Sequence, residues 1–154
     1  MWGRTDALIQ HPHDDGVWLG GVGSVARVAE LGIDAVVSLC RLGIDDVPAV
    51  GAADHATFWV VDSHDAGLNA HPDFVLREAA AAVERYRAKG KTVLLHCVRA
   101  ESRTPTVAAL YGARVVDVSP LEALEDVRRM LPGARPNPQF MRVLGGDSAP
   151  AVES

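Results

Sequence analysis

The chain is poor in cysteine, in lysine and in long apolar runs. Only two cysteines, Cys40 and Cys97, occur in 154 residues, which excludes a small secreted scaffold held together by disulfides. No apolar run approaches the roughly 18 residues that a membrane-spanning helix needs, so we expect no membrane partner. Two of the 15 basic residues are lysines, and the basic residues form no run; with a net charge of −5, this argues against nucleic acid as a partner.

Composition otherwise fits one globular domain. Hydrophobic residues make up 48% of the chain and charged residues 23%, which is ordinary for a domain with a sizeable core. The first residues lack the basic-then-apolar order of a signal peptide. We therefore expect a cytoplasmic, reducing location, in which Cys97 would remain a thiol.

Short apolar runs alternate with amphipathic stretches along the chain. The runs predict buried strands, and the stretches, with their capping residues and prolines, predict helices. The predicted strands are 17–20, 34–40, 57–61 and 91–97. The predicted helices are 22–32, 71–90, 105–116, 119–130 and 137–144. This alternation predicts an α/β fold with a central, mainly parallel sheet flanked by helices on both sides.

The stretch HCVRAESRT, residues 96–104, stands where the last predicted strand gives way to a helix. Ligands of such sheets bind beyond the carboxyl ends of the strands. At the start of the helix, free backbone N–H groups and the helix dipole make a cradle for an anion. A cysteine in that cradle, Cys97, would have its thiolate favoured over its thiol.

Arg103 adds a planar guanidinium, which can hold two oxygens of a phosphate at once. The spacing of Cys97 and Arg103 alone is weak evidence. The histidine before the cysteine, the hydroxyl residues around the arginine and the strand-to-helix context make the motif specific. A thiolate beneath an oxyanion held by amides and one arginine predicts nucleophilic attack on phosphorus.

HCVRAESRT resembles the active-site loop of the cysteine-dependent protein tyrosine phosphatases, most closely the small dual-specificity phosphatases. VWLGGVGSVARVAELGIDAVVSL resembles the opening of their domain, and PNPQFMRVL resembles the helix that often closes it. The resemblance spans most of residues 17–144. It implies a phosphatase-like domain over 17–145, preceded by an N-terminal segment (1–16) and followed by a flexible tail (146–154).

The resemblance also assigns roles. Cys97 would attack phosphorus to form a cysteinyl-phosphate, Arg103 would stabilise the transition state, and neither a metal nor a cofactor is needed. Thr104 would help the thiolate leave, and His96 would orient the loop. The implied phosphate-binding residues are Val98, Arg99, Ala100, Glu101, Ser102 and Arg103.

Two loop residues, Ala100 and Glu101, are unusual for an anion site, and the reaction also needs a proton donor. Ala100 stands where the family usually has glycine, and alanine with a positive φ costs about 1 kcal/mol. Glu101 puts a negative charge beside an anion site. Expelling an alkoxide needs a general acid, for which Asp62 at a strand end is preferred to Asp65. His64 is interpreted as a solvated loop residue rather than a substrate contact.

Other candidates have simpler interpretations. His11 and His13 lack metal-ligand spacing, so HPHDD (11–15) is interpreted as a solvated loop rather than a metal site. Cys40 is interpreted as a small core residue, although a disulfide with Cys97, known in some relatives, stays open. Asn69 is expected to cap the helix beginning near His71.

The leading hypothesis is therefore a metal-independent phosphatase acting on phosphotyrosine and phosphoserine or phosphothreonine in proteins, or on small phosphomonoesters. One alternative is a phosphate-binding module without turnover. A rhodanese-type sulfurtransferase is another alternative, although its cysteine loop seldom pairs His-Cys with Arg-Thr at this spacing. Nothing in the sequence sets the oligomeric state.

Overall fold

The computed structural model describes residues 5–42, 46–63 and 65–146. The residues after 146 and His64, about which the sequence made predictions, lie outside this range. The sheet has five strands in the order β1-β2-β5-β3-β4. Their bounds are Leu8–His11 (β1), Asp14–Gly20 (β2), Ala35–Ser38 (β3), His55–Thr57 (β4) and Val93–His96 (β5).

All neighbouring strands run parallel except β1 and β2, which form an antiparallel hairpin. Strand β5 lies in the middle of the sheet, and its last residue, His96, pairs with Gly20 of β2 and Ser38 of β3. The carboxyl ends of these three strands therefore meet at one edge, where sheets of this kind bind ligands. The predicted α/β class with a mainly parallel sheet is confirmed.

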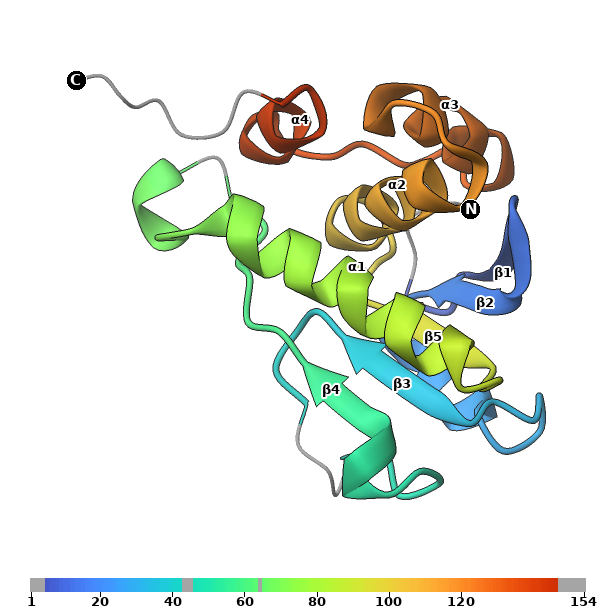
Figure 1. Ribbon diagram of the computed structural model, residues 1–154. Coiled ribbons are helices and arrows are strands. Elements are labelled where there is room, and N and C mark those ends of the chain that lie inside the picture. The colour runs from blue at the N-terminus through green and yellow to red at the C-terminus, as the bar shows by residue number, and fades with distance from the viewer. Residues whose placement is uncertain (1–4, 43–45, 64, 147–154) are drawn as a thin grey trace.

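The described residues form four α-helices, which lie on one side of the sheet (Figure 1). Helices α1 and α2 contact the central strands, α3 packs against α2 and β1, and α4 packs against α1 and α2. Their apolar side chains and the inward-facing residues of the strands form the larger core, which includes Phe140 and Leu95, both fully buried. The bounds are Pro72–Ala88 (α1), Arg103–Val116 (α2), Pro120–Met130 (α3) and Pro138–Leu144 (α4).

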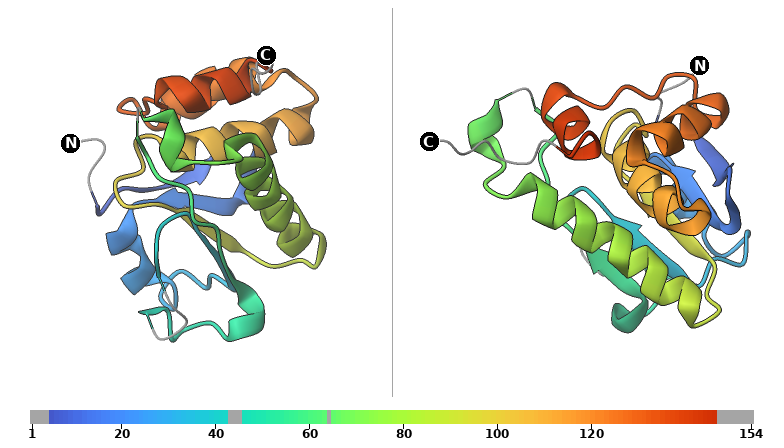
Figure 2. Two further views of the ribbon diagram at one scale, coloured as in Figure 1. Left: turned by 90° about the vertical axis from the view of Figure 1, so that its left-hand side faces the viewer. Right: turned by 45° about the horizontal axis from the view of Figure 1, so that its top comes forward.

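The opposite face carries the 3₁₀ helix η1, Val22–Arg27 (Figure 2, left). A smaller core, which includes Val28, Val36 and Leu94, lies beneath it. The sequence predicted an α-helix over 22–32, and that prediction is wrong in type and length. Gly23 approaches the main chain of Thr5 so closely that an added Cβ would lie 2.9 Å from its carbonyl oxygen. The segment stays tightly wound and turns at Gly32, whose φ is +67°.

Two further differences concern the edges of the sheet. Strand β1 was not predicted, and it places His11 at 3% exposure, so the interpretation of 11–15 as a solvated loop is wrong. Strand β4 ends at Thr57 instead of extending over 57–61. Beyond Phe58, whose N–H still donates to Ser38, the chain leaves the ladder because side chains take its backbone groups, as described below. The short 3₁₀ helices are η3 (Ala52–Asp54) and η4 (Ala66–Leu68).

Candidate active site

The loop from Cys97 to Ser102, called the phosphate loop below, joins β5 to α2. It is anchored to the chain after β2 on two sides. The N–H of Cys97 donates to the Gly20 carbonyl at 3.3 Å, and the N–H of Val22 donates to the Val98 carbonyl at 2.9 Å. Gly20 has no room for a side chain, because a Cβ there would lie 2.5 Å from Ser24 Oγ and 2.9 Å from the Ala7 carbonyl oxygen. Cys97 is thereby held at 2% exposure.

Ala100 adopts φ +62° and is 1% exposed. The expectation that this position needs a left-handed backbone is confirmed, and here alanine accepts it. Within the described residues, no protein acceptor receives the N–H groups of 98–102. These groups are therefore available to an anion.

Arg103 lies at the start of α2 and closes the loop. Its Nη1 donates to the carbonyls of Leu39 at 3.1 Å and Val60 at 3.2 Å. Its Nε is sealed from solvent and has no partner among the described residues. A buried guanidinium N–H without an acceptor is costly, and an anion in the loop would satisfy it.

Cys97 and Arg103 line one pocket of about 440 Å³ together with Asp62. The other lining residues are Val61, Val98, Arg99, Glu101 and Ser102. Of the residues predicted for the site, only His96, Ala100 and Thr104 do not line it. Arg99 is exposed and Glu101 half-buried, so both side chains stand at the rim.

His96 is buried behind the loop. Its Nδ1 lies 3.2 Å from the Cys97 carbonyl, and its Nε2 lies 2.6 Å from Ser38 Oγ. Burial lowers the pKa of His96 to about 4, so the ring is neutral at neutral pH. A neutral ring that donates from Nδ1 to the Cys97 carbonyl would orient the loop.

Thr104 is fully buried, and its hydroxyl donates to the Gly20 carbonyl at 3.4 Å. That carbonyl also accepts from the Cys97 N–H, so the hydroxyl stands beside the cysteine. Ser102 is 4% exposed, and its hydroxyl accepts the N–H of Asn137 at 3.0 Å. Ser102 therefore ties the phosphate loop to the segment before α4.

The two candidate acids lie in different surroundings. Asp62 is exposed at the pocket, and its Oδ1 accepts from Asn137 Nδ2 at 2.9 Å. Asp65 is not among the residues that line the pocket, and its Oδ1 accepts from the Gly67 N–H and caps η4. The geometry thus brings Asp62, and not Asp65, together with Cys97 and Arg103.

Sequence reasoning missed the contacts that two asparagines make beside the pocket. Asn69 does not cap α1, because His71 occupies the N-cap position of that helix. The Asn69 side chain binds the backbone of Val61 instead. Asn137 does cap α4, as the sequence indicated, but it also contacts Asp62 and the phosphate loop. The motif around Asn137 revealed a cap and gave no sign of the second role.

The remaining candidates do not line this pocket. His11 contacts the Ala108 carbonyl at 2.9 Å, and His13 pairs with Asp126 at 2.7 Å. In the part of the chain that the structure describes, no group of three or more His, Cys, Asp or Glu residues is arranged to hold a metal ion. Cys40 is buried at 9% exposure, which confirms it as a core residue.

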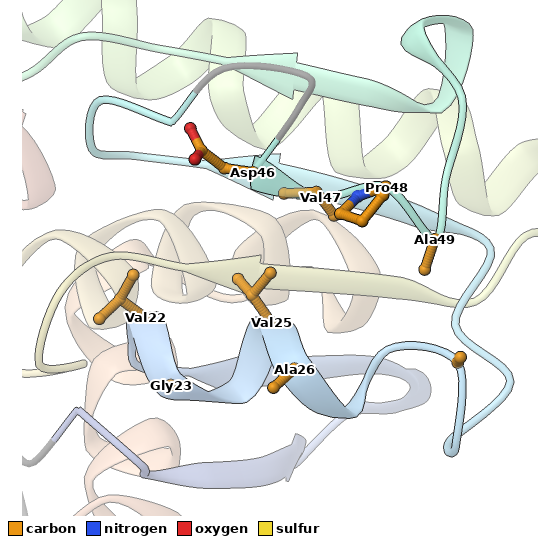
Figure 3. Close-up of a pocket in the computed structure, with 9 residues that line it drawn as sticks. Val22, Gly23, Val25, Ala26, Asp46, Val47, Pro48 and Ala49 are labelled. Atoms are coloured by element: carbon orange, nitrogen blue, oxygen red, sulfur yellow. The ribbon is translucent and has the colours of Figure 1, made fainter.

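A second hollow, of about 380 Å³, lies between η1 and the loop 46–49 (Figure 3). Small apolar side chains such as Val25 and Ala26 face Val47 and Pro48 across it. Among the described residues that line it, Asp46 is the only titratable one. This composition offers no catalytic chemistry.

Comparison with known proteins places the fold and the loop in context. No family model matches the chain. The chain is 30% identical over 136 residues to human protein phosphatase Slingshot homolog 3, covering 86% of this chain and 19% of that protein. It is 27% identical over 123 residues to the Arabidopsis thaliana dual specificity protein phosphatase PHS1, covering 79% and 13%.

Solved structures agree over nearly the whole chain. Human DUSP28 superposes with a TM-score of 0.71 at 23% identity, covering 91% of both chains. Tk-PTP, in a mutant form, gives a TM-score of 0.71 at 25% identity, covering 96% of this chain and 95% of that one. The chain belongs to the cysteine-dependent protein tyrosine phosphatase superfamily. Within this superfamily it is of the dual-specificity type.

This dual-specificity-type chain spans less than half the length of its curated relatives. It covers 41% of the Arabidopsis thaliana dual specificity protein phosphatase 1, to which it is 31% identical over 85 residues and 55% of its own length. None of the helices in the described part of the chain has the length and apolarity to span a bilayer.

Proposed function

We propose that this chain is a metal-independent phosphatase that hydrolyses phosphomonoesters through a cysteinyl-phosphate. The observation that carries the proposal is the buried Nε of Arg103, which lacks an acceptor and stands in the same pocket as Cys97. A phosphoryl oxygen would satisfy it, and the free N–H groups of residues 98–102 would bind the other oxygens. No cofactor enters this chemistry.

In the first step, the Cys97 sulfur forms a bond to phosphorus while the bond from phosphorus to the leaving oxygen breaks. Asp62, in its protonated form, gives its proton to that leaving oxygen. Arg103 holds the equatorial oxygens through the transition state. An alcohol or phenol departs, and the phosphoryl group remains on sulfur.

In the second step, water attacks phosphorus, the S–P bond breaks and inorganic phosphate is released. The Asp62 carboxylate takes a proton from the water, which restores the acid. The departing thiolate would receive a hydrogen bond from Thr104 once the hydroxyl turns its proton away from the Gly20 carbonyl, to which it donates in the structure. His96 would keep the loop in shape through the Cys97 carbonyl.

The pocket rim supports phosphorylated side chains of proteins as the substrate class. Val61 and Val98 at the rim are exposed by 45% and 36%, so the pocket is open rather than a deep slot. An open pocket admits phosphotyrosine and the shorter phosphoserine and phosphothreonine. Small phosphomonoesters would also enter it. The chemistry needs Cys97 as a free thiol, which a reducing cytoplasm maintains.

The test is hydrolysis of 4-nitrophenyl phosphate in the presence of EDTA, with orthovanadate as a competing anion. We expect turnover that EDTA does not affect, that vanadate blocks and that Cys97→Ser abolishes. Mass spectrometry of quenched Asp62→Ala enzyme should find a phosphoryl group on Cys97. Phosphate binding without turnover would instead indicate a binding module, and transfer of sulfur from thiosulfate to cyanide would indicate a sulfurtransferase.

A further inference from the structure

The segment that carries Asp62 has no regular secondary structure. After β4 ends at Thr57, no helix or strand is formed over residues 58–63. Asp62 itself is exposed. An exposed acid on an irregular segment would not by itself hold the alignment that proton transfer to a leaving group requires.

The Asn69 side chain fixes the backbone next to Asp62. Its Oδ1 accepts the N–H of Val61 at 2.8 Å, and its Nδ2 donates to the carbonyl of the same residue at 2.7 Å. Asn69 is 9% exposed, so water competes little for these bonds. The pair acts as a local substitute for the strand pairing that the segment lacks.

The start of α4 supplies the other half of this arrangement. Gln139 Oε1 accepts from Asn69 Nδ2 at 3.1 Å. Asn137 Nδ2 donates to Asp62 Oδ1 at 2.9 Å. Asn137 and Gln139 are only 5% and 8% exposed. Two buried amides from one helix turn therefore hold both the backbone and the carboxylate of the acid segment.

Asn137 is itself fixed in a single orientation. Its Oδ1 accepts the N–H of Phe140 at 2.9 Å, and its own N–H donates to Ser102 Oγ at 3.0 Å. Because the oxygen is occupied by the helix cap, the nitrogen must be the atom that faces Asp62. Phe140 is fully buried, so the helix turn that presents Asn137 is anchored in the core.

We propose that Asn137 is the positioning residue for the acid of this enzyme. It holds the Asp62 carboxylate at a fixed place over the phosphate loop, which it grips through Ser102. The inference rests on the proposed function, in which Asp62 protonates the leaving group. Asn137 does not touch the reacting atoms; it acts through Asp62.

Asn137→Ser separates the two roles of the side chain. Serine keeps an oxygen that can cap α4 but lacks the amide N–H that reaches Asp62. For phenyl phosphate, whose leaving group needs protonation, we expect kcat to fall by roughly tenfold or more. For 4-nitrophenyl phosphate, whose leaving group departs unaided, kcat should change by less than about threefold. KM should change little for both substrates.

A double variant distinguishes positioning from general damage. If Asn137 acts through Asp62, then Asn137→Ser added to Asp62→Asn should cause no further leaving-group-selective loss. Equal losses for both substrates, or losses that add in the double variant, would overturn the inference. Asn137→Asp, which also keeps a capping oxygen, repeats the test if the serine variant folds poorly.

A matched control and a structural measurement complete the design. Ser119→Ala removes another side-chain helix cap, that of α3, and should leave the ratio of the two kcat values unchanged. Hydrogen exchange should show the N–H of Val61 exchanging faster in Asn137→Ser than in the wild type. Unchanged exchange would contradict the proposal that Asn137 holds the segment around Asp62 in place. This measurement needs no activity. A wild type that hydrolyses neither substrate would refute the proposed function. The exchange result would still show whether Asn137 holds the segment around Asp62 in place.

Discussion

His96 Nε2 lies 2.6 Å from the hydroxyl oxygen of Ser38 in the middle of the sheet. The same hydroxyl lies 2.9 Å from Nε2 of His55. A serine hydroxyl has one proton to donate, so the two rings cannot both accept it. The network joins the strand that leads into the phosphate loop to the edge strand β4.

The pKa of His96 makes stability depend on pH. Burial lowers this pKa to about 4, whereas the unfolded chain takes up its proton near pH 6.5. The unfolded state therefore binds more protons between these values, and stability should fall as pH falls from 6.5 to 4. The shift corresponds to a loss on the order of 3 kcal/mol. Urea unfolding at pH 7, 5 and 4 measures it.

Two histidine variants serve as references for that measurement. His96→Asn should flatten the pH dependence, while His71→Asn, which changes a surface residue, should not. Some dependence will remain, because burial also lowers the pKa of His11. An equally steep loss of stability in His96→Asn would show that the effect arises elsewhere.

Ala100→Gly should stabilise the chain. Alanine at φ +62° is strained by about 1–2 kcal/mol, and glycine is not. The greater freedom of glycine in the unfolded chain offsets part of this gain, so we expect a net increase of about 0.5–1 kcal/mol. Thermal unfolding measures the stability of Ala100→Gly. The matched variant is Asp117→Gly, which relieves a similar φ of +55° at the end of α2, away from the phosphate loop. A destabilised Ala100→Gly would mean that the buried methyl group contributes more than the strain costs.

Asp62→Ala and Asp65→Ala should differ in their dependence on the leaving group. Asp62 lines the pocket with Cys97, so its loss should lower kcat for phenyl phosphate by roughly a hundredfold, with a smaller effect on 4-nitrophenyl phosphate. Asp65 caps a short helix, so its loss should lower stability by about 1 kcal/mol without that selectivity. The opposite result would transfer the acid role to Asp65.

Asp14 should be important for stability. Its carboxylate accepts two hydrogen bonds from Arg87, at 2.9 and 3.0 Å, and one from the Tyr111 hydroxyl at 2.6 Å. Burial opposes ionisation, but these hydrogen bonds outweigh it and keep the pKa of Asp14 below its ordinary value. Asp14→Asn should cost about 1–3 kcal/mol in urea unfolding. Asp73→Asn, which breaks an exposed pair with Arg77, should cost less than about 0.5 kcal/mol.

Local patterns in the sequence predicted the elements that build the active site. The strand before Cys97 and the helices with proline and a capping residue at their starts have strong local signals, and they formed as predicted. The prediction failed at the edges of the sheet. Strand β1 was missed although it forms a local hairpin with β2. The segment after Thr57 leaves the sheet because Arg103 and Asn69 bind the backbone of Val60 and Val61, and the contact with Arg103 spans 43 positions.

The same distinction holds for the site. Cys97 and Arg103 lie in one contiguous motif, so their spacing and the strand-to-helix context predicted their shared pocket. The contact between Asn137 and Asp62 joins residues 75 positions apart and cannot be seen in a local pattern. Asn69 shows the same limit, because an asparagine three residues before a helix suggests a cap, whereas its side chain binds the backbone of Val61, eight residues upstream.

The central place of β5 has a consequence for synthesis on the ribosome. Strands β2 and β3 do not pair with each other, and each pairs with β5, which emerges long after both. A nascent chain that stops before residue 93 holds two separate strand pairs with a missing strand between them. Insertion of β5 completes the sheet and brings Cys97 to its edge, so the sheet and the proposed active site form together, after β5 has been synthesised.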